Sequence, residues 1–178
     1  MAILKIARMG HPILRQRAQE VPDPMAPEVR RLVADMLDTM KDAAGTGLAA
    51  PQVHVPQRVV VFFVEAERAE REGDEEVAAV PLTVLINPEI EPLTEDTESG
   101  WEACLSVPDL IGEVTRPRAI RYRGTGLDGQ AIEREAEGFH ARVVQHECDH
   151  LDGILYPQRM DDLSKLLFHS EMKHYAQG

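Results

Sequence analysis

The stretch VVQHECDHLDG, residues 143–153, sets two histidines four positions apart, with a glutamate directly after the first. On a helix, residues four apart lie on one face, so His146 and His150 can present imidazole nitrogens to a single point. Such a point suits a divalent metal ion. In an H-E-x-x-H pattern the glutamate, here Glu147, takes a proton from a water on the metal. The stretch therefore predicts a metal-binding helix around which the rest of the fold is built.

The chain has 178 residues, and we expect them to form a single catalytic domain over 1–178 with a sizeable core. Hydrophobic residues make up 43% and charged residues 28%, as in soluble globular proteins. The formal net charge of -12 gives no electrostatic footprint for stable nucleic-acid binding. The apolar run at 59–64 is too short to cross a membrane, and Lys5 interrupts the apolar N-terminus before a signal-peptide core forms. We expect a cytoplasmic protein with no membrane partner.

Helical periodicity appears in three places along the chain. Apolar residues recur at helical spacing over 26–43, and Gly45 follows as the expected stop of this N-terminal helix. From Phe139 onward the apolar period again becomes 3.6, which predicts that the two histidines lie on a helix. The stretch DDLSKLLFHSEMKHY, 161–175, has the pattern of a closing amphipathic helix.

Short segments that are alternating or rich in β-branched residues, each bounded by Pro, Gly or Asn, predict antiparallel strands between these helices. They are 58–64, 82–90, 119–124 and 131–138. Between the first two, residues 65–76 are so highly charged that we expect a solvated loop. Strands followed by a motif helix predict an α+β fold, with antiparallel sheets packed around the H-E-x-x-H helix and one helix near each end of the chain.

A catalytic zinc-type site usually takes three protein ligands, and the residues alone leave the third open. In the extended H-E-x-x-H-x-x-G-x-x-H pattern the place of the third ligand would fall on Tyr156, which disfavours that class of peptidase. In another group of peptidases a glutamate further along the chain completes the site, and Glu171 lies at about that sequence separation after His150, although on a polar segment. Cys104 offers a thiolate suited to a borderline-soft metal, whereas Cys148 lies off the histidine face and is expected to be a packed core thiol.

Three segments together resemble the motifs of the peptide deformylase family. They are GTGLAAPQ at 45–52, EACLS at 102–106 and QHECDH at 145–150. The segments GHPILRQRAQEV and VTRPRAI are also similar to that family, so the resemblance covers nearly the whole chain. It implies a hydrolase that removes the formyl group from the N-terminal formylmethionine of newly made bacterial polypeptides. Its partners would be these nascent peptides, in transient proximity to the ribosome.

The resemblance also implies the ligand set and the ion. Cys104, His146 and His150 would hold one divalent metal. Affinity order alone favours zinc over iron in such a site. Members of the family nevertheless typically work with ferrous iron and tolerate nickel or cobalt, so we expect Fe²⁺ as the native ion, with Ni²⁺, Co²⁺ or Zn²⁺ in purified protein.

Roles in the reaction follow from the same resemblance and agree with general chemistry. A water activated by the metal would attack the formyl carbon, while Glu147 takes its proton and passes it to the leaving amine. The side-chain amide of Gln52 and the backbone N–H of Leu105 would donate to the oxygen on which charge builds.

Substrate contacts are expected from five residues. Gly45 and Gly47 fit a helix stop and a close approach of backbone to substrate. Phe139 and Val143, at helical spacing before His146, would wall an apolar pocket for the methionine side chain. Arg116 matches a family arginine near the exit of the peptide.

One residue departs from the family pattern, because Ala103 stands where Glu-Gly-Cys-Leu-Ser has glycine. If the backbone there had a positive φ, alanine would cost on the order of 1 kcal/mol; with an ordinary φ the methyl group would matter only where it meets the substrate.

Two other classes of protein remain open. A zinc endopeptidase would use Glu171 as ligand and tolerate loss of Cys104, and a binding module would have lost a catalytic group, although Glu147, Gln52 and Cys104 are all present.

Overall fold

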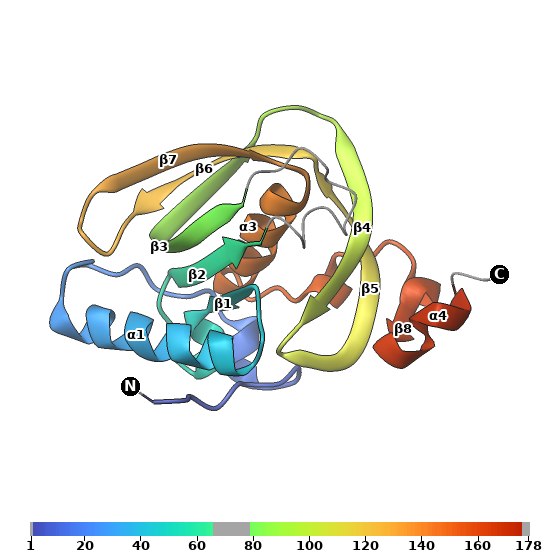
Figure 1. The fold of residues 1–178 in the computed structure, drawn as a ribbon, viewed down its shortest axis with the longest axis horizontal. Coiled ribbons are helices and arrows are strands. Elements are labelled where there is room, and N and C mark those ends of the chain that lie inside the picture. The colour runs from blue at the N-terminus through green and yellow to red at the C-terminus, as the bar shows by residue number, and fades with distance from the viewer. Residues whose placement is uncertain (1, 66–78, 176–178) are drawn as a thin grey trace.

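The computed structural model describes residues 2–65 and 79–175 (Figure 1). Of the loop predicted at 65–76, all but its first residue lies outside this described part. Among the helices of the described part, none combines the length and the apolar character needed to cross a membrane. The chain has an α+β architecture with two antiparallel sheets, as the sequence predicts.

The larger sheet has five strands in the order β1-β2-β3-β6-β7, all antiparallel. Its strands are β1 Gly47–Ala49, β2 Val59–Val64, β3 Val80–Pro92, β6 Ala119–Thr125 and β7 Ala131–Glu137. The four longer strands match the four segments predicted from the sequence. β1 and β7 form the two edges of this sheet, and β1 lies within the motif at 45–52.

The smaller sheet has the order β4-β5-β8. Its strands are β4 Thr97–Cys104, β5 Val107–Pro117 and β8 Leu166–Phe168. The sequence patterns predict none of the three, because β4 is mostly exposed and mixes charged, small and aromatic residues without a clear apolar alternation. β4 is an edge strand of this sheet, and it ends at Cys104.

Two long helices cover opposite faces of the larger sheet. The helix α1, Pro27–Asp42, packs with Val59 and Val61, while α3, Gly138–Leu151, packs with Val60 and Phe62. Successive side chains of a strand point to opposite faces, so β2 is apolar throughout because both of its faces are buried. The bounds of α1 agree with the predicted helix to within one residue.

The helix α3 carries the H-E-x-x-H stretch and lies between the two sheets (Figure 1). It contacts strands of the larger sheet and also β5 of the smaller one. As a result every residue from Ala141 to Leu151 is buried. Polar side chains in such a setting must find partners, because an unpaired buried charge is costly.

The predicted closing helix at 161–175 is wrong. This segment forms a 3-10 turn at Leu163–Lys165, the strand β8, another 3-10 turn and a four-residue helix, α4 Met172–Tyr175. β8 pairs with Leu110–Gly112 of β5, and Leu166 packs against the core of the smaller sheet. β8 pairs with the side of β5 that β4 leaves open, which satisfies backbone groups of β5 that would stay unpaired if 161–175 were a helix. Tertiary contact therefore overrides the local helical pattern.

Candidate metal centre

Two elements bring three side chains that can bind a metal to one point. Cys104 ends β4, and His146 and His150 lie one turn apart on α3. Their ligand atoms all lie within 4.8 Å of one another, and Cys104 Sγ is 3.3 Å from His150 Nε2. No other group of this kind occurs among residues 2–65 and 79–175. The structure thus brings together the three residues that the resemblance implies as ligands.

Glu102 fixes the orientation of His146. The Nδ1–H of His146 donates to Glu102 Oε2 at 2.8 Å, because an ionised carboxylate can only accept. This tautomer leaves Nε2 as a lone-pair donor, the form in which a histidine binds a metal. Glu102 also accepts from Arg116 at 2.6 and 2.9 Å and from Arg142 at 2.9 Å. These bonds hold the glutamate in place.

Arg116 lies inside the protein, which corrects the expectation that it contacts the substrate. Its side chain is 5% exposed, and besides Glu102 it donates to Asp149 Oδ2 at 2.8 Å. All three guanidinium nitrogens are therefore occupied by carboxylates, and Arg116 is not among the residues that line the cleft. Its role is to position Glu102 and, through Glu102, His146.

The charges around this point favour a cation. Burial opposes ionisation of Glu102, yet hydrogen bonds from Arg116 and His146 hold the pKa of this carboxyl far below its usual range. Burial also opposes a charged His146, but Cys104 and Glu102 raise the pKa of this imidazole well above its ordinary value. Burial lowers the pKa of His150 well below its ordinary value and keeps it in the neutral form that binds metals. Groups that favour a proton at His146 would equally favour a divalent ion.

Glu147 stands beside the donor atoms and has no hydrogen-bond partner for its Oε2 among the described residues. The side chain is 5% exposed, and burial raises the pKa of its carboxyl to about 7. Gly47 on β1 makes room for it, because a Cβ at Gly47 would lie 2.7 Å from Glu147 Cγ. A buried carboxyl with an unpartnered oxygen, next to a thiol and two imidazoles, fits a site that holds a metal and its water.

Gln52 reaches the same point from the 3-10 helix Ala50–Val53. Its side-chain oxygen accepts from Ala49 N–H at 2.8 Å, which directs the amide nitrogen away from the backbone. That nitrogen donates to Ser106 Oγ at 3.1 Å and lies 3.5 Å from Cys104 Sγ. The amide N–H group is therefore held beside the candidate metal ligands, where a substrate oxygen would need a donor.

A cleft of about 540 Å³ opens over the donor atoms. Its lining includes Glu147 and His146 from α3, together with Val143 and Phe139, which lie about one and two turns before His146. Phe139 is partly buried and Val143 is 7% exposed, so both present apolar surface to the cleft. Both residues predicted to wall a substrate pocket therefore line this cleft.

Gly45 borders this cleft but is not the left-handed stop of α1. The helix ends at Asp42, and the residue with positive φ after it is Ala44, at 51°. A Cβ at Gly45 would come within 2.9 Å of Leu105 Cδ1. Gly45 therefore allows Leu105, the residue expected to donate its backbone N–H, to pack against the opposite wall of the cleft.

Ala103 has an ordinary extended conformation in β4, so no backbone strain arises from the missing glycine. Its side chain is exposed and lines the cleft, as does Ile111, which stands opposite it on β5. The second of the two expectations for this position therefore applies, and the methyl group matters through what it meets in the cleft.

The remaining candidates fall where their chemistry suggests. Cys148 is 3% exposed among the apolar residues between α3 and the larger sheet, and burial raises the pKa of its thiol. Glu171 is exposed in a 3-10 turn and accepts a hydrogen bond from Ser170. Neither belongs to the group of donor atoms, so the endopeptidase ligand set finds no support here.

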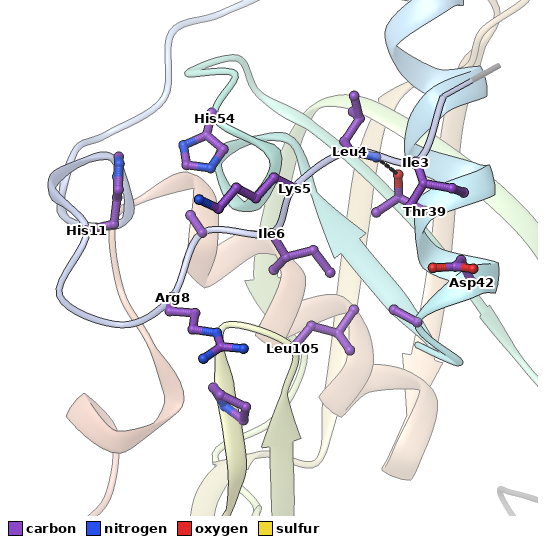
Figure 2. Close-up of a pocket in the computed structure, with 13 residues that line it drawn as sticks. Ile3, Leu4, Lys5, Ile6, Arg8, His11, Thr39, Asp42, His54 and Leu105 are labelled. Atoms are coloured by element: carbon purple, nitrogen blue, oxygen red, sulfur yellow. Dashed lines mark hydrogen bonds between the residues drawn. The ribbon is translucent and has the colours of Figure 1, made fainter.

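A second cavity, of about 700 Å³, lies on the far side of Leu105. Figure 2 shows the N-terminal segment from Ile3 to Arg8 along this cavity, with Leu105 facing it. The segment is tied to the candidate site, because Ala7 N–H donates to Gln52 O at 2.7 Å and Met9 N–H donates to Ser106 O at 2.7 Å. These two backbone hydrogen bonds hold Gln52 and Ser106 in place from the side of the second cavity.

Four contributors to the site are absent from the expectations drawn from sequence, namely Glu102, Ser106, Arg142 and Asp149. Arg142 donates to the backbone oxygens of Glu98 and Val114 as well as to Glu102, and so fastens α3 to the smaller sheet. The sequence did contain a sign that Arg142 and Asp149 have partners, because charged residues on a helix that also carries buried histidines must be paired. The partner of each could not be known before the sheets were placed.

A buried thiol and two imidazoles around one point form a group that could hold a metal ion, and a carboxyl of raised pKa beside them is a combination typical of metal-dependent hydrolases. A family model described as polypeptide deformylase matches residues 3–166. The chain therefore belongs to the polypeptide deformylase family, whose members are hydrolases that remove a formyl group.

Relatives agree with this membership in sequence and in structure. Peptide deformylase 1 of Bordetella pertussis is 56% identical over 160 residues, 90% of this chain and 89% of its own. The peptide deformylase of Ehrlichia chaffeensis superposes with a TM-score of 0.83 at 30% identity, over 92% and 91% of the two chains. A class I type b peptide deformylase of Acinetobacter baumannii, solved with Met-Ala-Ser bound, gives 0.80 at 33% identity, over 89% and 99%.

Proposed function

We propose that this protein hydrolyses the N-formyl group of the N-terminal formylmethionine of newly made polypeptides, with Glu147 as general base and acid. The observation that carries the proposal is the group formed by Cys104, His146 and His150, with Glu147 beside it in an open cleft, where its Oε2 has no hydrogen-bond partner among the described residues. Cys104, His146 and His150 would hold the ion. When bound there, a divalent ion supplies a water of lowered pKa and polarises the carbonyl of the formyl group.

Glu147 carries the proton in this scheme. Its carboxylate accepts a proton from the water as the water oxygen bonds to the formyl carbon. It then gives that proton to the departing amine nitrogen as the carbon–nitrogen bond breaks, which leaves formate and a free N-terminus. Burial raises the pKa of Glu147 to about 7, so the group can both accept and return a proton near neutral pH.

Gln52 and Leu105 stabilise the charge that develops on the formyl oxygen. The amide nitrogen of Gln52 is already aimed at the donor atoms by the Ala49 contact, and Ser106 keeps it there. Leu105 directly follows Cys104 and lines the same cleft, so its backbone N–H would border the same point. Donors fixed before the substrate arrives need no reorganisation in the transition state.

The peptide chain would bind as an added strand. β1 and β4 are edge strands of the two sheets, and residues of both line the cleft. An extended peptide can pair with the unpaired backbone groups of such edges, and its side chains then alternate between the two sides. The methionine side chain would enter the apolar pocket of Phe139 and Val143, which cannot take a carboxylate without a large penalty.

Turnover of formyl-Met-Ala-Ser by the metal-loaded protein tests this function. We expect rapid release of formate, no cleavage of acetyl-Met-Ala-Ser and no cleavage of internal peptide bonds. Cleavage of internal bonds, or equal turnover of the formyl and acetyl peptides, would reject the proposal. Such an enzyme works on nascent chains in the bacterial cytoplasm, in transient proximity to the ribosome.

Fe²⁺ is the ion that we propose for the native enzyme. A Cys-His-His donor set also accepts Ni²⁺, Co²⁺ and Zn²⁺, so occupancy after purification does not identify it. Cys104 is 9% exposed at the cleft, where peroxide can oxidise its thiolate. Peroxide also reaches Fe²⁺, which it oxidises, so we expect the Fe²⁺ form to be fast and to lose activity with peroxide. The Ni²⁺ form should persist, because Ni²⁺ resists a change of oxidation state. A Zn²⁺ form that is fastest, together with a peroxide-resistant Fe²⁺ form, would overturn this assignment.

A further inference from the structure

The strand β4 has two chemically different faces. Glu102 and Cys104 point inward to α3, where they meet His146 and His150. Side chains alternate along a strand, so Trp101 and Ala103 point to the outer face. Both line the same cleft as the candidate metal ligands, together with Ile111 of β5. One cleft is therefore bordered by the inward side chains Glu102 and Cys104 and by the outward side chains Trp101 and Ala103 of a single edge strand.

An extended peptide beside β4 would use these faces in turn, and this step rests on the proposed function. The first side chain enters the pocket of Phe139 and Val143, which belong to α3 on the inner side. The second side chain must then point to the outer side, because successive side chains of a strand alternate. The relative from Acinetobacter baumannii binds a tripeptide, so a second residue has a place in clefts of this family.

We propose that Ala103, with Ile111 beside it, selects substrates whose second residue is apolar. Ala103 is exposed, and Ile111 stands opposite it in register on β5 and is half-buried. Trp101, two residues earlier on the same face, is held by an edge contact with Tyr175 at a ring distance of 5.3 Å. These side chains form an apolar wall that an apolar second residue can cover, whereas a polar one would lose water without gaining a partner.

The methyl group of Ala103 is the part of this wall nearest the peptide, since β4 is the edge strand and β5 lies behind it. Because this surface lies away from the donor atoms, it contributes to the bound substrate and to the transition state alike. Removing it should therefore raise KM and leave kcat unchanged.

The experiment compares formyl-Met-Leu-Ser with formyl-Met-Asn-Ser, since leucine and asparagine have similar size and neither is charged. The wild-type, metal-loaded protein should prefer the leucine peptide by at least about fivefold in kcat/KM. Ala103→Gly should reduce this preference by about two- to threefold through a higher KM for the leucine peptide. Ile111→Ser should reduce it further.

Ala131→Gly is the matched control, because Ala131 is an exposed strand alanine on β7, in the other sheet. It should leave the preference unchanged. A preference that survives both Ala103→Gly and Ile111→Ser would overturn the proposal, and so would a stronger leucine preference in Ala103→Gly, because the methyl would then crowd the substrate. Failure of the proposed function would look different, since neither peptide would be deformylated.

Discussion

Near Cys104 the inner and outer faces of β4 differ in burial and in polarity although they share one backbone. Inward, Glu102 and Cys104 are buried and bonded to charged or metal-binding partners. Outward, Trp101 and Ala103 present apolar surface to an open cleft. The difference shows how one edge strand can separate reaction chemistry from substrate choice: inward changes should alter metal binding and kcat, and outward changes should alter KM and peptide preference.

The largest effect is expected at the inward end of β4. Cys104→Ala removes one of three donors, so we expect loss of stoichiometric metal and of measurable turnover. Glu171→Ala removes an exposed carboxylate that does not belong to the donor group, so it should change neither the metal content nor the turnover. Metal content after dialysis, measured by atomic absorption together with formate release, separates the two. Metal loss in Glu171→Ala with retention in Cys104→Ala would favour an endopeptidase site.

A smaller loss is expected at Gly47 of β1, which lines the same cleft. In Gly47→Ala the new methyl group would collide with the side chain of Glu147 and displace its carboxyl. A shift of about 1 Å in a reacting group costs on the order of 10² in rate, so kcat should fall by about that factor while the metal stays bound. Stopped-flow or discontinuous formate assays on the fully loaded variant measure it. Unchanged kcat would show that Glu147 can move without consequence.

The smallest of these effects is expected at Glu102, which acts through His146. Glu102→Gln keeps the shape but weakens the bonds with Arg116, Arg142 and the His146 Nδ1–H. Loss of such a supporting partner typically lowers metal affinity by about 10- to 100-fold. Competition with a chelator of known affinity measures this change. Glu98→Gln, an exposed change on the same strand, is the control and should leave affinity unaltered.

Sequence patterns predicted well what depends on local periodicity. The helix over 26–43, the helix bearing His146 and His150 and the strands β2, β3 and β6 have clear apolar patterns because each buries several apolar residues, whereas β7 buries only Ala136. The donor group could be expected from a resemblance in three separated motifs. Only the fold shows that Cys104, distant by more than forty positions, lies 3.3 Å from His150.

Other features could not be predicted because they depend on distant partners. β4 and β5 carry no clear alternation, and the 161–175 segment has helical spacing but pairs as β8 with β5 instead. Arg116 gave no local sign that it would be buried between Glu102 and Asp149 rather than face the substrate. In each case the deciding energy comes from tertiary pairing, which a single sequence does not display.

The central claim is that Cys104, His146 and His150 hold the ion while Glu147 moves the proton, and one variant separates these tasks. Glu147→Gln keeps all three donors, so the Ni²⁺-loaded variant should contain one ion per chain. A positioned acid–base group contributes about 10² to 10⁴ in rate, so kcat for formyl-Met-Ala-Ser should fall by that factor at full metal occupancy. Near-wild-type turnover in the fully loaded variant would contradict the account and remove Glu147 from the mechanism.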